Sequence, residues 1–217
     1  MEWSLLAGLD PQLKQEVVAS CRRRRFARGE IVFHQGDPGD SLFIVSAGRV
    51  AIRVSTALGD VVTLAVLGPG DAFGEMALLR DDPARTASAV ALDSAELLAL
   101  HRRDFEQLRR REPQVDRLLV EALAARVERV NQYLLEALHQ PADKRLARRL
   151  IDLFARFGGG AQGAALSFTQ EDLASIAGAS RPTANRLLRD LEDAGIIEIG
   201  RGRLRLLDPQ ALERRAR

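Results

Sequence analysis

The chain has 217 residues, of which 46% are hydrophobic and 29% charged, a composition typical of a folded globular protein and not of a disordered chain. It contains no apolar run long enough to cross a membrane, and its start, MEWSLLAGLD, has no basic region before an apolar stretch. We therefore expect a cytoplasmic protein without a membrane partner. Cys21 is the only cysteine, which excludes an internal disulfide and a four-cysteine zinc or iron–sulfur site within one chain.

The charged residues are unevenly distributed. The net charge is +2, yet residues 139–217 hold 14 Arg and Lys against 10 Asp and Glu, while residues 1–138 hold 18 against 20. The C-terminal part is therefore the better candidate for binding a polyanion. The three histidines, His34, His101 and His139, lie far apart and in no metal-type spacing, so no metal site is predicted.

From Glu30 to about Leu100 the sequence consists of short β-branched runs separated by turn signals. The turns at 36–39 and 68–71 stand at the spacing expected between antiparallel strands. The glycines of the second turn do not form a G-x-G-x-x-G pattern and no long helix follows, so they indicate a turn and not a dinucleotide loop. This segment predicts an antiparallel β sandwich or barrel.

The stretch FGEMALLRDDPARTA at 73–87 contains Glu75 and Arg85 among apolar and small residues. A buried guanidinium must be paired, so Arg85 is expected to face either Glu75 in a structural ion pair or a bound anion. In the second case Arg85 would bind a phosphate, and backbone N–H groups near Gly74 and Ala77 would complete a small anion cradle. Glu75 would then accept a hydrogen bond from a sugar hydroxyl. These residues alone leave both interpretations open.

Residues 102–139 predict a short helix followed by a long one that begins at Pro113. Apolar side chains recur along the long helix every three or four residues, at Val120, Leu123, Val127, Val130, Leu134 and Ala137. Charged residues flank this seam, at Glu121, Arg126, Glu128 and Arg129. The pattern favours a two-stranded coiled coil between two subunits over packing within one domain.

Gln140 and Pro141 interrupt the helical pattern and indicate a hinge. Asp143 is expected to cap the following helix, which the glycines at 158–160 end.

The most specific local pattern lies over 169–207. Thr169 opens a capping box with Asp172, Gly178 permits a tight turn, and Ser180 can cap a second helix that stops at Gly195. Core positions are expected at Leu173, Ile176, Ala184, Leu187 and Leu191. A β-hairpin follows, so the segment predicts a winged helix-turn-helix.

The start of the second helix in such a motif meets base edges in the major groove. Its arginines can read guanine and its asparagine adenine, whereas threonines and wing arginines can bind phosphates. The residues expected to contact DNA are Thr169, Ser180, Arg181, Thr183, Asn185, Arg186, Arg201 and Arg203.

In this order, these parts resemble the bacterial cyclic-AMP receptor protein and FNR superfamily of transcription regulators over nearly the whole chain. The resemblance rests on G-E-x-x-x-x-Q-G-D at 29–37, the phosphate-binding cassette F-G-E-M-A-L-L-x5-R-T-A at 73–87, the long helix and the winged motif. It implies an α+β fold: a jelly-roll-like antiparallel β-roll that binds a cyclic nucleotide (1–112), a dimerisation helix (113–139) and a winged helix-turn-helix domain (140–217).

The resemblance implies a homodimeric regulator controlled by a cyclic nucleotide, cyclic AMP before cyclic GMP, without a covalent cofactor. Its implied partners are double-stranded DNA with a roughly palindromic operator, a second copy of the chain bound through residues 113–138, and RNA polymerase. By position, Gly74 and Ala77 offer amides to the cyclic phosphate, Arg85 pairs with an exocyclic oxygen, and Glu75 binds the ribose 2′-hydroxyl. The implied ligand residues are Gly74, Glu75, Met76, Ala77, Arg85, Thr86, Val130 and Asn131.

Three departures from the family pattern concern specificity. The cyclic-AMP receptor caps the purine with adjacent Thr and Ser, where this chain has Val130 and Asn131, and only Asn131 can hydrogen-bond adenine. Thr86 stands where a threonine favours cyclic GMP in some relatives. Pro182 replaces a base-reading glutamate, so the DNA half-site is expected to differ from the usual one.

Other functions of the same fold remain open at this point. The effector would then be another metabolite, a gas or the redox state. Alternatively, the regulator would be ligand-independent and the cassette would be only a structural ion pair. Cys21 is followed by Arg22 to Arg25, which would lower its pKa and make it reactive, unless it is an ordinary surface cysteine beside solvated arginines. An enzyme is not predicted, because the sequence has no P-loop, H-E-x-x-H motif, nucleophile elbow or clustered acid–base pair.

Overall fold

The structure is a computed structural model that describes residues 10–56, 61–80 and 83–217. It divides into two compact units, Met1–Gly59 with Leu64–Arg129 and Asp60–Thr63 with Val130–Arg217. None of the helices in the described ranges combines the length and hydropathy that crossing a bilayer requires.

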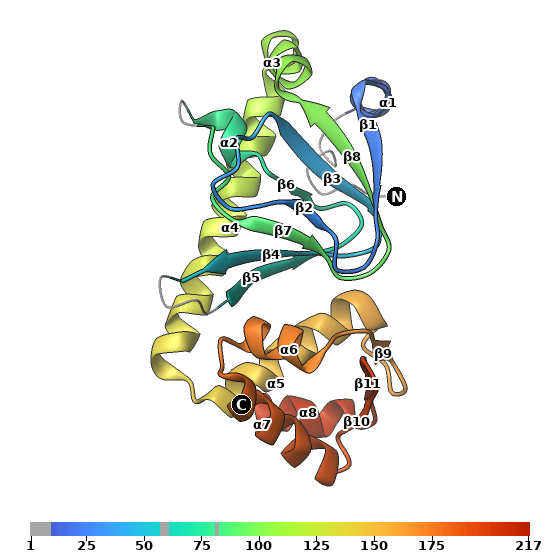
Figure 1. The fold of residues 1–217 in the computed structure, drawn as a ribbon, viewed down its shortest axis with the longest axis vertical. Coiled ribbons are helices and arrows are strands. Elements are labelled where there is room, and N and C mark those ends of the chain that lie inside the picture. The colour runs from blue at the N-terminus through green and yellow to red at the C-terminus, as the bar shows by residue number, and fades with distance from the viewer. Residues whose placement is uncertain (1–9, 57–60, 81–82) are drawn as a thin grey trace. The chain divides into compact units, whose positions relative to one another are not determined.

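The N-terminal unit contains two four-stranded antiparallel sheets, in the orders β1-β8-β3-β6 and β2-β7-β4-β5 (Figure 1). The strands are β1 (Arg22–Phe26), β2 (Ile31–Phe33), β3 (Ser41–Ala47), β4 (Val50–Ser55), β5 (Val61–Leu67), β6 (Ala72–Phe73), β7 (Ser88–Ala91) and β8 (Ala95–His101). The sequence-based prediction of an antiparallel β-roll is confirmed.

Strand β3 shows how the roll is stabilised, because both of its faces are buried. Phe43 and Val45 belong to the core cluster shared by the two sheets. Leu42 and Ile44 point the other way and pack with residues of the helices that cover this sheet. Since alternate side chains of a strand face opposite sides, a strand buried on both faces has a continuous apolar run. Each such side chain contributes roughly 1.5–3 kcal/mol through burial.

Among the described residues, four helices begin in this unit: α1 (Pro11–Ser20), α2 (Met76–Leu79), α3 (Arg102–Arg111) and α4 (Gln114–His139). Phe105 of α3 and Val115 and Leu119 of α4 join the cluster on the outer face of the first sheet. The predicted helices over 102–139 are therefore present, and the boundary between the two units falls within α4. Helix α1 was not predicted.

The C-terminal unit contains α5 (Ala142–Leu153), η2 (Phe154–Gly158), α6 (Gln170–Ala177), α7 (Arg181–Asp193) and α8 (Pro209–Ala216). A small antiparallel sheet, in the order β10-β11-β9, is formed by β9 (Ala165–Leu166), β10 (Ile197–Gly200) and β11 (Arg203–Leu206) (Figure 1). The predicted winged helix-turn-helix is thus confirmed, with β9 and α8 as elements that the sequence pattern did not reveal.

The caps of the helix-turn-helix are those that the sequence predicts. Thr169 accepts from the Asp172 N–H in a reciprocal capping box, and the Ser180 side chain accepts from the Thr183 N–H. Gly178 ends α6 in the left-handed region at φ 59°, which a glycine adopts without strain.

Two local predictions were wrong. Asp143 does not cap α5, because the helix starts at Ala142 and Pro141 occupies the cap position without a side-chain hydrogen bond. Of the predicted core positions, Ile176 and Leu187 are only half-buried, whereas Leu188 is fully buried together with Ala184 and Leu191. Positions 184, 188 and 191 are spaced by four and three residues and share one helix face, from which position 187 is displaced.

Candidate functional site

A pocket in the N-terminal unit brings the cassette residues together. It is lined by Phe33, Ile52, Phe73, Gly74, Glu75, Met76, Ala77, Arg85, Thr86, Ala87 and Arg126. Six of the eight ligand residues expected from the sequence are among these. The other two, Val130 and Asn131, are exposed on α4 and belong to the C-terminal unit, so their contact with a ligand stays a prediction.

Arg85 is buried, with only 5% of its surface exposed. Its Nη1 donates to the Gly74 carbonyl and its Nη2 to the Ser41 carbonyl, each at 2.9 Å, and the guanidinium lies 4.2 Å from the ring centroid of Phe33. Its Nε has no hydrogen-bond partner among the described residues. Burial lowers the pKa of Arg85, which the charges of Asp40 and Glu75 only partly oppose. The guanidinium is therefore a desolvated cation held by neutral carbonyl groups.

Glu75 is also buried, but its partner is not Arg85. Its Oε1 accepts a hydrogen bond from Arg126 Nη1 at 2.9 Å, and Arg126 comes from α4. The predicted alternative of a Glu75–Arg85 ion pair does not occur here. Arg126 was expected only as a charge beside the apolar seam, because nothing in its sequence spacing indicates that it reaches a pocket.

Two glycines allow the backbone to approach Arg85 closely. Gly74 has φ +86°, and a Cβ there would lie 2.7 Å from Arg85 Nη1. A Cβ on Gly39 would lie 2.4 Å from Ala77 Cβ and 2.8 Å from Arg85 Nε. Any larger residue at either position would displace the guanidinium or the short helix α2. Because α2 begins at Met76 and its first bonds run from the Leu78 and Leu79 N–H groups to the Glu75 carbonyl, the N–H groups of Met76 and Ala77 have no acceptor within their own helix.

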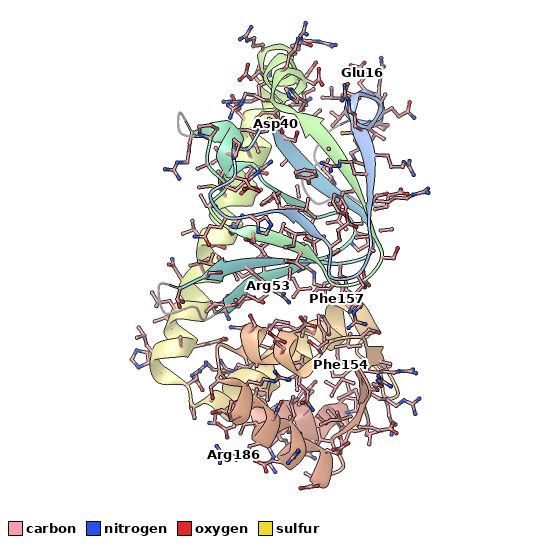
Figure 2. All side chains as sticks on the ribbon, in the orientation of Figure 1. Glu16, Asp40, Arg53, Phe154, Phe157 and Arg186 are labelled. Atoms are coloured by element: carbon pink, nitrogen blue, oxygen red, sulfur yellow. The ribbon has the colours of Figure 1, made fainter. Side chains whose placement is uncertain are left out.

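The C-terminal unit presents the residues expected to contact DNA on and beside α7. Arg181 and Arg186 are exposed, and Figure 2 labels Arg186 on this helix. Asn185 is half-buried and its Oδ1 has no partner among the described atoms. Arg189, which the sequence reading missed, is also exposed, three residues beyond Arg186 on the same helix. Helix α7 therefore carries three exposed guanidinium groups, of which those of Arg186 and Arg189 are neighbours on the helix surface.

The hydroxyl groups of the motif are already hydrogen-bonded. Thr169 Oγ1 donates to Asp172 Oδ2 at 2.7 Å, so its single proton is not available for a phosphate in this arrangement. The Ser180 and Thr183 hydroxyls lie 2.9 Å apart and bond to each other.

The β10–β11 hairpin, which is the wing of the motif, supplies further cationic groups. Arg201 and Arg203 are exposed, and with Gln170 they line a hollow between the start of α6 and the β10–β11 hairpin. Its floor is apolar, formed by Phe168, Leu173, Leu188, Ile199 and Leu204. Gln170 was not predicted as part of this surface, because it looks like an ordinary first-turn helix residue.

Comparison with known proteins agrees with this geometry. The family described as "Cyclic nucleotide-binding domain" matches residues 23–112, and the "Crp-like helix-turn-helix domain" matches residues 144–215. The chain is 36% identical to the "Cyclic AMP receptor protein" of Thermus thermophilus, with 96% of this chain and 94% of the relative covered. The chain belongs to the Crp/FNR family of transcription regulators.

Two further relatives of this Crp/FNR chain extend over nearly its whole length. The "CRP-like cAMP-activated global transcriptional regulator" of Mycobacterium tuberculosis is 32% identical, with 98% of this chain and 96% of the relative covered. The crystal structure of the Thermus thermophilus catabolite activator protein is 36% identical, covers 98% of each chain and has a TM-score of 0.57. The protein is thus a cyclic nucleotide-binding transcription regulator of the Crp/FNR family, and its relatives are regulators and not enzymes.

Cys21 of this Crp/FNR protein is not the activated thiol that the adjacent arginines suggested. It is half-buried, and its Sγ donates to the Val17 carbonyl. Burial raises the pKa of the Cys21 thiol to about 11, and the charge of Asp104 adds to the effect. The thiol is therefore almost entirely protonated at neutral pH.

Proposed function

We propose that this protein is a homodimeric regulator that binds an operator in response to cyclic AMP, with the nucleotide bound beside Arg85. The observation that carries the proposal is the desolvated Arg85 guanidinium, whose Nε lacks a partner among the described residues and which no described carboxylate pairs. Such a group is stabilised by an anion, and two oxygens of a phosphate can accept parallel hydrogen bonds from the planar guanidinium. Gly74, Met76 and Ala77 are proposed to add backbone contacts to the same phosphate.

The sugar is proposed to lie next to Glu75. A carboxylate is an acceptor only, so it suits a ribose 2′-hydroxyl that donates. Arg126 already donates to one oxygen of this carboxylate and leaves acceptor capacity on the other. The nucleotide would therefore bind both the cassette and a residue of α4.

The purine is proposed to meet Thr86 from the roll and Val130 and Asn131 from α4. Cyclic AMP is favoured because the Mycobacterium tuberculosis relative is named as cAMP-activated and the Thermus thermophilus relative as a cyclic AMP receptor. Cyclic GMP is the alternative, because the Thr86 hydroxyl can hydrogen-bond the guanine edge.

A second copy of the chain is proposed to pack on α4. Val120, Val127, Val130 and Leu134 are each more than half exposed, although they form the predicted heptad seam. A row of large apolar side chains at this spacing is stabilised by burial in a two-stranded coiled coil. Two copies would present two α7 helices to a roughly palindromic operator in double-stranded DNA.

Each DNA half-site is proposed to contact Thr169, Ser180, Arg181, Thr183, Asn185, Arg186, Arg201 and Arg203. For Thr169 this requires that its hydroxyl exchange the bond to Asp172 for one to a phosphate. The nucleotide controls binding only if it has a higher affinity for the DNA-binding arrangement than for the other one. The protein is proposed to act in the cytoplasm, to contact RNA polymerase at its promoters, and to leave the nucleotide chemically unchanged.

Calorimetry with cyclic AMP and cyclic GMP tests the ligand assignment. We expect wild type to bind cyclic AMP, Arg85→Leu to lose at least about tenfold in affinity, and the exposed control Arg103→Leu to bind as wild type does. The affinity of the protein for an operator selected from random DNA should then rise on addition of cyclic AMP. Absence of binding to either nucleotide by folded wild type would refute the proposal.

A further inference from the structure

Arg102 is a second, half-buried cation that contacts the cassette, and it does not line the pocket. It is the first residue of α3, where the positive end of the helix dipole disfavours a cation. Its guanidinium is turned away from that helix and donates to three carbonyl groups: Leu78 at 3.2 Å, Gly39 at 3.4 Å, and Ala77. Ala77 and Leu78 lie in α2 and Gly39 in the loop before β3, so one side chain joins two separate segments.

The loop that Arg102 holds is also the loop that supports Arg85. The Arg102 backbone N–H donates to the carbonyl of Asp40, which Figure 2 labels, at 2.7 Å. The Arg85 N–H donates to the Asp37 carbonyl and the Gly36 N–H to the Arg85 carbonyl, each at 2.8 Å. Residues 36–41 are therefore bonded to Arg85 on one side and to Arg102 on the other.

Gly39 is the point at which these contacts meet. Its Cα faces both Ala77 and the Arg85 guanidinium so closely that a Cβ would lie 2.4 Å from Ala77 Cβ and 2.8 Å from Arg85 Nε. A shift of this loop or of α2 would consequently move Arg85 and the amides of α2 relative to each other. Helix α2 has four residues and no side-chain N-cap hydrogen bond, so it has little internal stability of its own.

We infer that Arg102 is a positioning residue for the nucleotide phosphate: by binding the carbonyls of Ala77, Leu78 and Gly39 it fixes the α2 amides at the distance from Arg85 that a cyclic phosphate spans. The inference rests on the proposed function. The positive charge of Arg102 also adds, after burial, to the lowering of the pKa of Arg85, so an anion bound at the cassette is favoured by both guanidinium groups.

Arg103 provides a matched control for Arg102. It is the next residue in α3 and carries the same charge, but its side chain is exposed. We therefore compare Arg102→Met, Arg102→Lys and Arg103→Met with wild type in the full-length protein. Calorimetry measures the affinities for cyclic AMP and for its Sp and Rp phosphorothioates, in which sulfur replaces one or the other exocyclic oxygen. Thermal unfolding without ligand reports any loss of folded protein.

We expect Arg102→Met to weaken cyclic AMP binding about tenfold, because three charge-assisted hydrogen bonds are lost, and Arg103→Met to leave it unchanged. Arg102→Lys should restore part of the affinity, since an ammonium group can still donate to carbonyls. The ratio of Sp to Rp affinities should move toward one in Arg102→Met, because a loosened cradle distinguishes the two oxygens less well. A general loss of folded protein would weaken the binding of both isomers equally and leave the ratio of their affinities unchanged.

The outcomes separate this inference from the proposed function. If wild type binds cyclic AMP and Arg102→Met has the affinity and isomer ratio of Arg103→Met, the positioning role is overturned and the proposed function stands. If Arg102→Met loses affinity equally for the Sp and Rp isomers, the positioning role is overturned as well. If wild type binds neither cyclic AMP nor cyclic GMP, the proposed function fails, and the positioning role fails with it.

Discussion

Arg126 Nη1 donates to Glu75 Oε1 at 2.9 Å, so a guanidinium of α4 is bound to the carboxylate of the cassette. Glu75 is 8% exposed, and a buried carboxylate without a cation would be strongly disfavoured. The pair therefore connects the cassette to the helix that is proposed to carry the dimer seam, and a nucleotide at Glu75 binds next to that connection.

Replacing Arg126 should weaken nucleotide binding through Glu75. We expect Arg126→Met to lower the affinity for cyclic AMP about tenfold, because Glu75 loses the charge-assisted bond that orients it. The affinity for 2′-deoxy cyclic AMP should fall less, since that ligand has no 2′-hydroxyl to donate to Glu75. Calorimetry with both ligands measures the difference, with the exposed Arg129→Met as control. Equal losses for the two ligands would contradict the role of Glu75 at the ribose.

The apolar seam of α4 leads to a prediction about the oligomeric state of the protein. Val127→Glu should convert a dimer into monomers at micromolar concentration, because the charge would be buried in the coiled coil at a cost of several kcal/mol. Sedimentation velocity measures the change, and Gln132→Glu, at an exposed position outside the seam, should leave the dimer intact. A wild-type protein that sediments as a monomer would contradict the proposed dimer.

A buried ion pair links the end of α4 to α5. Glu136 Oε2 accepts from Arg149 Nη2 at 2.5 Å, the side chains are 7% and 11% exposed, and the Arg149 guanidinium lies 3.6 Å from the ring centroid of Tyr133. These contacts cross Gln140 and Pro141, where the sequence predicted a hinge. The last turns of α4 are therefore held to α5 within one compact unit.

Breaking this pair should destabilise the C-terminal unit. We expect Glu136→Ala to lower its free energy of unfolding by about 3 kcal/mol, because the buried Arg149 would keep only the exposed Asp152, at 3.5 Å, as a carboxylate partner. Urea unfolding measures the loss, and Asp143→Ala, an exposed carboxylate in the first turn of α5, should change it by less than about 1 kcal/mol. If both variants have the same free energy of unfolding, the Glu136–Arg149 pair contributes little to stability.

The parts of the molecule that could be predicted from the sequence are those determined by residues close together in the chain. Caps and turns such as Thr169 and Gly178 depend on neighbouring residues, and the order of the elements made the family recognisable. Strand β1 was missed because its four arginines are exposed and only Phe26 is buried, so no alternation marks it. The partners of Glu75 and Arg102 were missed because they are set by packing between segments far apart in the chain, which no spacing rule describes.

Cys21 should react slowly with alkylating reagents at neutral pH. Its thiol pKa, raised to about 11, lies above the ordinary value, so the thiolate is present only as about one part in ten thousand at pH 7. The rate with iodoacetamide should therefore increase about tenfold per pH unit from pH 7 to pH 10. The same protein in urea, where burial is removed, serves as the control and should react faster at pH 7. A rate that levels off near pH 8 in the folded protein would contradict the raised pKa.

Arg186 should discriminate between operator and random DNA. Its exposed guanidinium lies on the second turn of α7, and bidentate donation to guanine O6 and N7 contributes about 1–3 kcal/mol of discrimination. We expect Arg186→Ala to weaken binding to an operator selected from random sequences about tenfold or more, and binding to random DNA far less. Fluorescence anisotropy at fixed salt measures both, with Arg214→Ala on α8 as an exposed control. Equal losses on the two DNAs would mean that Arg186 binds phosphate and not a base, and would leave Arg181 and Arg189 as the remaining arginines of this helix that can read guanine.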